Sequence, residues 1–300
     1  METGSSDHPA RLRVGIIGPG RAGTALGRAL EAAGHRVVAA HAISEPSVRR
    51  VTENFRLARL ADPADVIDDS DLVLLTVPDD DLEGLVRGLA DTGAPLAGRM
   101  LAHASGSHGV GVLDPAAQHG ALPLAVHPVM TFAGREDDLD RIKGTCFAVT
   151  ARGPLRAVAE VLVIEMGGEP VFIAEESRPL FHAALALASG HLAAVATEAA
   201  SLLRQAGAPH PGRMLGPLLA AALDNAVRLG DAGLTGPAAD GDSSTLRAHL
   251  ATLADASPGA HEAYLAVARL TVDRALAAGS LRPADADRLR DVLSDGRSAG

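Results

Sequence analysis

The sequence has few of the residues that form disulfides, metal clusters and aromatic platforms. It contains one cysteine, Cys146, one tyrosine, Tyr264, and no tryptophan among 300 residues. A single cysteine excludes disulfides within the chain and metal sites built from cysteine, and it fits a reducing, cytoplasmic location. Lysine is as rare, because Lys143 stands alone. A catalytic Tyr/Lys pair is therefore disfavoured, since the two lone residues fall in different halves of the chain.

Basic residues are also in deficit. The chain has 27 lysines and arginines against 37 aspartates and glutamates, which gives a formal net charge of −10. Nucleic acids and anionic membranes bind basic surfaces, so neither is an expected partner. Residues 1–11 are polar, show no signal peptide and predict a flexible tail. The most hydrophobic helical stretch, 180–203, carries two histidines and Glu198, so we expect a buried core helix rather than a membrane span.

The chain is rich in apolar residues, and they follow an ordered pattern. They make up 47% of the 300 residues, and this length favours two domains over one. Between residues 12 and 174 apolar strands alternate with helices, which predicts an α/β domain with a doubly wound, mostly parallel sheet. From 175 to 300 strand signals vanish, and the leucine spacing predicts helices only. The expected strands cover residues 14–17, 36–40, 72–77, 99–103, 122–128, 145–150 and 170–174.

The first strand runs directly into a glycine-rich turn and a helix. The turn reads Gly18-Pro19-Gly20-Arg21-Ala22-Gly23, and strand, GxGxxG and helix in this order are typical of dinucleotide binding. In that motif Gly18 would permit the tight turn, Gly20 would leave room for a pyrophosphate, and Gly23 would let helix and strand pack closely. Unpaired amides at the helix start favour the negative charge of the pyrophosphate. The alternative is a plain tight turn.

The end of the second strand bears on the choice of dinucleotide. An acidic residue there typically binds the ribose 2′-hydroxyl of NAD, whereas basic or small polar residues accommodate the 2′-phosphate of NADP. No acid closes this strand, while Ser44 and Arg49 follow it. The pattern favours NADP, with NAD as the alternative because Glu45 is adjacent. Ser44 could instead only cap the next helix.

Candidate site residues lie at the ends of three of the expected parallel strands. Ligands bind beyond the carboxyl ends of strands in open α/β sheets. Val77-Pro78 and His103 lie at two such ends, and we expect them to contact the cofactor. Ser105 follows His103 closely, and His127 ends another strand, so both are candidates to polarise a substrate carbonyl. Packing roles for the histidines remain the alternative.

The helical half offers a candidate proton donor. His182 and Ser189 are seven residues apart, so on a regular helix they share one face. Histidine titrates near neutral pH, which makes His182 the preferred general acid. His191 falls on another face of a regular helix, and the pair lacks the spacing of zinc ligands, so no metal site is expected. Asn225 could contact substrate, or could be a buried polar group with a backbone partner.

The chain resembles a family with an N-terminal Rossmann-like domain followed by a helical domain of unknown function. This family is allied to 6-phosphogluconate dehydrogenases, pyrroline-5-carboxylate reductases and ketopantoate reductases. The resemblance implies an NADP-dependent oxidoreductase whose helical, 6-phosphogluconate-dehydrogenase-like domain dimerises and closes over the nicotinamide. The matching stretches, in chain order, are 18–23, Thr76-Val77-Pro78-Asp79, Ala102-His103-Ala104-Ser105-Gly106, 125–132, Phe181-His182-Ala183-Ala184, Leu223-Asp224-Asn225 and Leu234-Thr235-Gly236-Pro237.

Two positions depart from the family pattern. The chain has Ser189-Gly190 where the family has Ser-Asn, and Asp240 where the later loop has arginine. Both changes concern the substrate rather than the cofactor.

These observations predict a cytoplasmic, homodimeric NADP(H)-dependent reductase. Its substrate would be a small carbonyl compound, such as a ketopantoate-like 2-keto acid, with His182, His127 and Ser105 as catalytic residues and Ser189 and Asn225 facing substrate. One alternative is an imine reductase of the pyrroline-5-carboxylate type. Another is a dinucleotide-binding regulator without catalysis.

Overall fold

The computed structural model describes residues 11–295. The chain forms two compact units, Met1–Ala188 and Ser189–Gly300. The last strand ends at Phe172, close to the predicted boundary at residue 174, whereas the compact units divide inside the helical run that follows. Most of the predicted tail lies outside the described residues. Its last residue, Arg11, donates a hydrogen bond to the carbonyl of Ala33.

The first unit is built on an eight-stranded sheet with the order β3-β2-β1-β4-β5-β6-β7-β8. All ladders are parallel except β6 with β7, which is antiparallel, so the predicted mostly parallel sheet is confirmed. Two-residue β3 and helix α3 have no strong periodicity, and the sequence pattern missed both. The strands are β1 Arg13–Ile17, β2 Arg36–His41, β3 Arg59–Leu60, β4 Leu72–Leu75, β5 Met100–His103, β6 Leu122–Pro128, β7 Cys146–Thr150 and β8 Glu169–Phe172.

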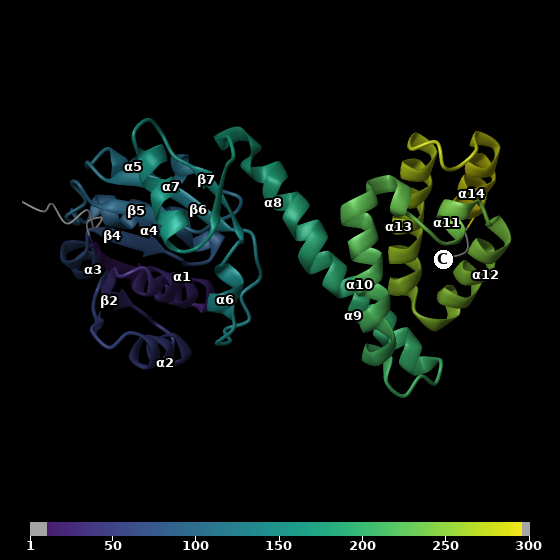
Figure 1. Ribbon diagram of the computed structural model, residues 1–300, viewed down its shortest axis with the longest axis horizontal. Coiled ribbons are helices and arrows are strands. Elements are labelled where there is room, and N and C mark those ends of the chain that lie inside the picture. The colour runs from purple at the N-terminus through teal and green to yellow at the C-terminus, as the bar shows by residue number, and fades with distance from the viewer. Residues whose placement is uncertain (1–10, 296–300) are drawn as a thin grey trace, which may run out of the picture. The chain divides into compact units, whose positions relative to one another are not determined.

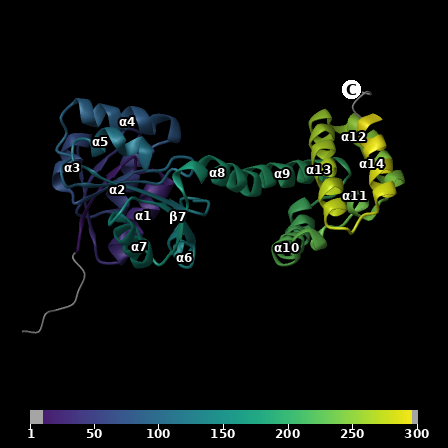
Figure 2. The same ribbon diagram turned by 90° about the horizontal axis from the view of Figure 1, so that it is seen from above.

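Helices cover both faces of this sheet (Figures 1 and 2). One core cluster joins Ile16 of β1 to α1 and α7, and the other joins Ile17 of the same strand to α3 and α4. Successive strand residues thus serve opposite faces, as the pleat requires. The helices of this unit are α1 Arg21–Ala32, α2 Glu45–Asn54, α3 Pro63–Asp69, α4 Asp79–Asp91, α5 Asp114–Ala117, α6 Asp138–Ile142, α7 Leu155–Glu165 and α8 Arg178–Ala186, with short turns η1 Val110–Leu113 and η2 Glu175–Ser177.

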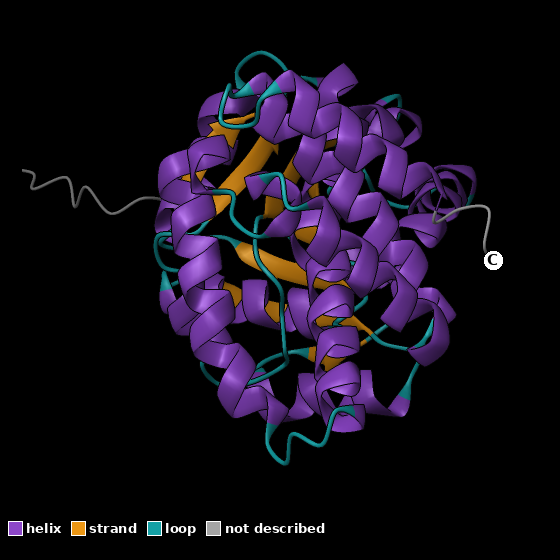
Figure 3. Cartoon of the chain, turned by 90° about the vertical axis from the view of Figure 1, so that its right-hand side faces the viewer, coloured by secondary structure: helices purple, strands orange, loops and turns teal. Residues whose placement is uncertain are grey.

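The described part of the second unit contains helices, short turns and loops but no strand. Figure 3 colours the helices of the whole chain purple and its strands orange. Its core joins Leu246 and Leu250 of α12 to Leu265 of α13 and Leu289 of α14. The prediction of an all-helical second domain is confirmed. The helices are α9 Leu192–Gln205, α10 Pro211–Leu229, α11 Pro237–Asp240, α12 Ser243–Ala256, α13 Pro258–Ala277 and α14 Pro283–Asp295, with a short turn η4 Gly230–Gly233.

A π-helical turn interrupts the run that links α8 to α9. This turn, η3, covers Leu187–His191. A π-turn holds more residues than an α-turn and rotates everything that follows it. The face shared by His182 and Ser189, and the other face given to His191, were derived for a regular helix. The structure has a π-turn there, so this premise does not hold over Leu187–His191.

The same helical run is also more exposed than the sequence predicted. The segment Glu175–Gln205 is long and apolar enough to cross a membrane by length and composition alone, yet 0% of its apolar window is buried within the chain. The expectation that the chain's own core buries this helix was therefore wrong. Its alanines and leucines find few partners in the chain itself.

Candidate functional site

The glycine turn has the geometry that the sequence predicted. Gly18 adopts a φ of +84°, a left-handed conformation that glycine allows without strain. Its amide donates to the carbonyl of His41 at 3.1 Å, which ties the turn to the end of β2. Since the order of strands reverses between β1 and β4, the turn lies at the switch point where such sheets bind ligands.

Gly23 lets α1 lie close to β4. A Cβ at Gly23 would lie 2.2 Å from the Oγ1 of Thr76. That hydroxyl donates to the carbonyl of Gly18 at 2.7 Å, so one side chain locks the turn and fills the space beside Gly23. The predicted packing role of Gly23 is confirmed.

Gly20 differs from its two neighbours in the motif. A Cβ there would meet only the carbonyl of Gly18, at 3.9 Å. Its φ of −74° is open to any residue, so the fold itself does not require glycine at this position. The bare backbone faces open space at the start of α1, where Arg21 and Ala22 begin the helix. A pyrophosphate fits this cradle, and the amides of the first turn are its natural donors.

Ser44 and Arg49 have local partners. Ser44 is the N-cap of α2 and accepts from the amide of Ser47 at 3.3 Å, so it does cap the helix, and its contact with a 2′-phosphate remains a prediction. Arg49 pairs with Glu45 at 3.0 Å. Both side chains are largely exposed, so the guanidinium of Arg49 on α2 remains accessible.

His103 is a support for the neighbouring loop. The residue is buried, with only 1% of its surface exposed. Nε2 donates to the carbonyl of Gly109 at 2.8 Å, and Nδ1 accepts from the amide of Ser105 at 3.2 Å. Burial lowers the pKa of His103 to about 4, which keeps the ring neutral. Both nitrogens are used and the ring is covered, so the side chain supports the loop. The contact of this residue with a cofactor remains a prediction.

His127 and His182 lie together around Gly106. Their ring centroids are 6.0 Å apart, and a Cβ at Gly106 would lie 2.7 Å from His182 and 3.0 Å from His127. Nδ1 of His127 lies 2.9 Å from the carbonyl of Ala104. A carbonyl only accepts, so Nδ1 carries the proton and Nε2 of the neutral ring is an acceptor. Burial lowers the pKa of His127.

Ser105 belongs to a polar cluster that the sequence reasoning missed. Its hydroxyl lies 3.1 Å from Nδ1 of His108, and Ser107 donates to Asp79 at 2.6 Å. Burial disfavours the charge of Asp79, but hydrogen bonds from Ser107 and Ser105 and the nearby histidines lower its pKa below the usual value. Asp79 stands in the stretch 76–79 and His108 three residues after Ser105, so proximity to the motifs was the available signal.

This cluster does not form a Ser-His-Asp triad. In a triad the serine and the aspartate use different ring nitrogens of the histidine. Here Ser105 and Asp79 both face Nδ1 of His108, at 3.1 Å and 4.0 Å. In this cluster the hydroxyls of Ser105 and Ser107 lie between the carboxylate of Asp79 and the ring of His108.

Comparison with known proteins gives the domain family. A model of the Rossmann-like domain matches residues 1–128, and a model of a domain of unknown function, DUF2520, matches residues 145–271. The chain combines a Rossmann-like domain with a DUF2520 domain. No curated protein matches it in sequence.

Solved structures share this two-domain fold. A protein from Bacteroides fragilis assigned as an NADP oxidoreductase is 22% identical, with a TM-score of 0.71 over 88% of this chain and 98% of that one. The imine reductase of Myxococcus stipitatus with NADP+ is 19% identical, with a TM-score of 0.62 over 87% and 94%. The 1-pyrroline-5-carboxylate reductase of Streptococcus pyogenes is 18% identical, with a TM-score of 0.58 over 88% and 98%. At these identities the likeness establishes the fold.

A buried arginine, Arg178, bonds the backbone close to the candidate residues Ser105 and His127. Arg178, at the start of α8, is 0% exposed. It donates to the hydroxyl of Thr150 at 2.8 Å and to the carbonyls of Ala148 at 2.9 Å and Ser105 at 3.4 Å. Burial lowers its pKa to about 10, which leaves it charged. This cation disfavours a second positive charge on His103 and His127.

The two predicted substrate residues lie in the other compact unit. Ser189 is in η3, and Asn225 is in α10. Asn225 is exposed, so the interpretation as a buried polar group was wrong. The contact of either residue with substrate remains a prediction.

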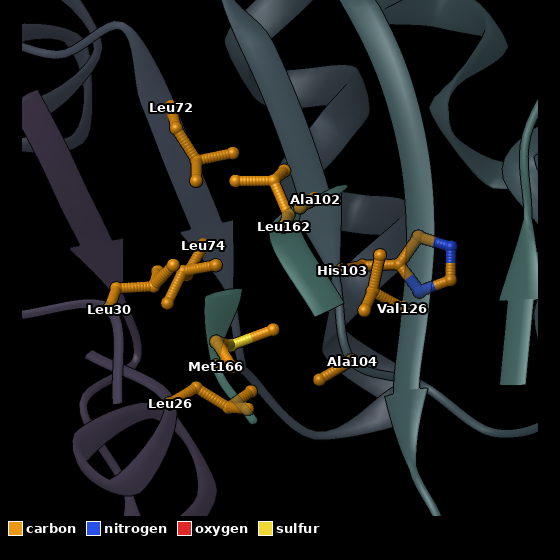
Figure 4. A pocket seen from close by; sticks show the side chains of 10 residues that line it. All are labelled: Leu26, Leu30, Leu72, Leu74, Ala102, His103, Ala104, Val126, Leu162 and Met166. Carbon is orange, nitrogen blue, oxygen red and sulfur yellow. The ribbon is translucent and has the colours of Figure 1, made fainter. Parts of the chain in front are cut away.

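A small cavity under His103 is part of the core rather than a ligand site. It has a volume of about 20 Å³ and is lined by apolar side chains such as Leu74, Val126 and Met166 (Figure 4). That is about the space of one water, and few polar groups are present to hold one. Among residues 11–295, no group of three or more His, Cys, Asp or Glu side chains is placed to hold a metal ion.

Proposed function

We propose that this protein is an NADP(H)-dependent reductase of a small carbonyl compound. The observation that carries the proposal is the open cradle at Gly20, where a Cβ would meet only one protein atom within 4 Å, at 3.9 Å. The fold fills the space beside Gly18 and Gly23 and leaves it empty at Gly20, as pyrophosphate binding requires. The solved structures that share the fold, among them an NADP oxidoreductase and an imine reductase with NADP+, support it.

The cofactor would be held by the turn and by the ends of two strands. The turn, Gly18-Pro19-Gly20-Arg21-Ala22-Gly23, receives the pyrophosphate. Val77 and Pro78 border this turn, and the Cγ1 of Val77 would lie 2.8 Å from a Cβ at Gly18. Ser44 and Arg49 take the 2′-phosphate, which gives NADP its advantage over NAD. Arg49→Ala should therefore weaken NADPH binding more than NADH binding.

The protein residues would orient the substrate and supply its proton. The bound dinucleotide supplies a hydride. Ser105 donates a hydrogen bond to the substrate oxygen. Nε2 of the neutral His127 ring only accepts, so it takes a hydrogen bond from an O–H or N–H of the substrate and does not polarise the carbonyl. Because its pKa is lowered, His127 is a poor proton donor at neutral pH. His182, half-buried beside it, is the general acid that protonates the alkoxide oxygen.

The substrate class separates two candidate activities. A carbonyl substrate, such as a 2-keto acid, leaves an alkoxide that needs one proton. An imine is reduced most readily as its protonated form, and the relatives named as imine and pyrroline-5-carboxylate reductases keep this candidate open. A regulator that binds the dinucleotide without turnover is the third candidate.

We also propose that the active form is a cytoplasmic homodimer. Helices α9 and α10 contain one buried residue between them, Pro211, while Leu218 is 64% and Val227 86% exposed. Exposed apolar side chains that gather on neighbouring helices are typical of an interaction surface. A second copy would cover it and would bury the helix that the chain leaves bare.

An absorbance assay of NADPH with 2-keto acids and cyclic imines tests the activity. Gly20→Val should abolish NADPH binding in calorimetry, because its side chain occupies the cradle. His182→Ala should lower the single-turnover rate by roughly two to four orders of magnitude with little change in NADPH affinity. His191→Ala, at an exposed residue at the end of η3, is the control and should keep the rate. Wild-type NADPH affinity in Gly20→Val would refute the cofactor site, and a wild-type rate in His182→Ala would remove that residue from the mechanism.

A further inference from the structure

A second cavity lies on the flank of the first unit, away from the histidine cluster. It has a volume of about 320 Å³ and lies between α1, α2 and the loop that leads into α6. Both α2 and α6 pack against α1 (Figure 1). This size is in the range of small-molecule pockets. All of its lining residues belong to one compact unit.

Arginines dominate the donors of this cavity. Arg21 and Arg28 enter from α1, and Arg50 enters from α2. In the described part of the chain, none of these three guanidinium groups makes a hydrogen bond or an ion pair. Most other arginines of the first unit have a carboxylate partner, for example Arg13 with Asp71 at 2.9 Å. Three unpaired guanidinium groups around one cavity leave their donors available to a ligand.

The acidic residues of the cavity do not neutralise these arginines. Asp138 accepts from the amides of Gly134 at 2.7 Å and Arg135 at 3.2 Å. Its carboxylate therefore holds the loop and is turned toward backbone. Glu53 and Glu136 also line the cavity, but neither forms an ion pair with an arginine in residues 11–295. Asp138 thus fixes the loop that lines the cavity, and the arginines give the cavity its positive charge.

We propose that this cavity binds a small polyanion, such as a phosphorylated or polycarboxylated metabolite, at a site separate from the proposed dinucleotide site. A planar guanidinium matches phosphate and carboxylate oxygens with paired hydrogen bonds. Three arginines from two helices and a wall of loop backbone suit a ligand with at least two anionic groups. The site goes beyond the proposed reductase activity, since Arg28 lies on the flank of α1 and Arg50 on α2, away from Gly20. Arg21, which follows Gly20 in the glycine turn, borders both sites.

Calorimetric titration of the full chain with inorganic pyrophosphate tests the proposal. The titration is done with saturating NADPH, which occupies the glycine turn, and again with the Gly20→Val variant, which closes it. We expect pyrophosphate to bind in both cases. Arg28→Ala and Arg50→Gln should each weaken it about tenfold or more, the effect of losing one charged hydrogen bond. Arg56→Ala, an exposed arginine just after α2 that does not line the cavity, should leave it unchanged.

Three results would overturn the site. One is the absence of pyrophosphate binding at millimolar concentration in the wild type. Another is the loss of binding when NADPH is present and in Gly20→Val, which would assign the anion to the dinucleotide site. The third is an equal loss in Arg56→Ala, which would indicate general charge attraction. Failure of NADPH to bind at all would refute the reductase proposal and leave this test intact, because Gly20→Val still closes the turn.

Discussion

Gly106 separates the two histidine rings of the proposed active site. It is not among the glycines with positive φ, so alanine is compatible with its backbone. What it provides is space, because a Cβ would lie 2.7 Å from His182.

Gly106→Ala should therefore displace the rings and slow turnover. We expect a fall of about tenfold to hundredfold in the single-turnover rate, since misplacement near the reacting atoms is costly. NADPH affinity should change little. Gly84→Ala is the control, because a Cβ at Gly84 has nothing within 4 Å. A wild-type rate for Gly106→Ala would contradict the placement of His127 and His182 around the substrate.

His103 makes the stability of the protein depend on pH. The unfolded chain protonates this histidine below pH about 6.5, whereas the folded chain does so only near pH 4. Between these values the unfolded state binds more protons, so stability falls as pH falls. The loss attributable to this one residue is about 3 kcal/mol over that window.

Urea unfolding at several pH values measures this effect. His103→Gln keeps a donor for the carbonyl of Gly109 and removes the titration, so its unfolding free energy should depend less steeply on pH than that of the wild type. Lowered carboxyl pKa values, such as that of Asp79, act in the same direction in both proteins. Equal slopes for the two proteins would show that His103 is not held neutral.

At the scale of elements, the contact between the glycine turn and β4 organises the first unit. Thr76 follows β4 and bonds Gly18 at 2.7 Å, and it leaves a Cβ at Gly23 only 2.2 Å from its hydroxyl. The helix cannot carry a larger residue there without moving Thr76.

Gly23→Ala should consequently destabilise the protein by about 1–3 kcal/mol, the usual cost of overpacking, and weaken NADPH binding. Thr76→Ala in the same chain should recover part of the stability, because it removes the hydroxyl. Gly88→Ala, on an exposed face of α4 with nothing within 4 Å, should instead stabilise by up to about 1 kcal/mol. Thermal unfolding of the wild type and these three variants measures the changes in stability. A Gly23→Ala protein as stable as the wild type would refute the close packing of Gly23 against Thr76.

At the scale of the molecule, the apolar helices of the second unit predict self-association. Leu218→Asp places a charge on a residue of α10 that is 64% exposed in the single chain. If a second copy covers this helix, the variant should be monomeric in sedimentation or light scattering, while the wild type is a dimer. Leu57→Asp, at a residue 66% exposed outside these helices, should stay dimeric. A monomeric wild type would refute the dimer.

Much of the architecture follows from local sequence alone. The strands around Ile16 and Leu74 depend on side-chain periodicity, and the turn at Gly18 depends on the backbone freedom of glycine. Those properties act over a few residues, so the sequence predicted them. Short elements such as β3 and α3 escaped because two to seven residues give too little periodicity.

The sequence by itself determined the two-part organisation, the mostly parallel sheet, the helical second half and the three-glycine turn, because each depends on spacing between near neighbours. Only the tertiary structure decided which polar groups meet. It joined Asp79 to Ser107, placed Arg178 under the histidines, and gathered the arginines of α1 and α2 around one cavity, since these contacts link distant segments. It also decided the π-turn before α9 and the solvent-exposed position of Asn225. The spacing of apolar residues along a helix does not reveal where a π-turn adds a residue. It also does not reveal which neighbour, if any, covers a given face of the helix.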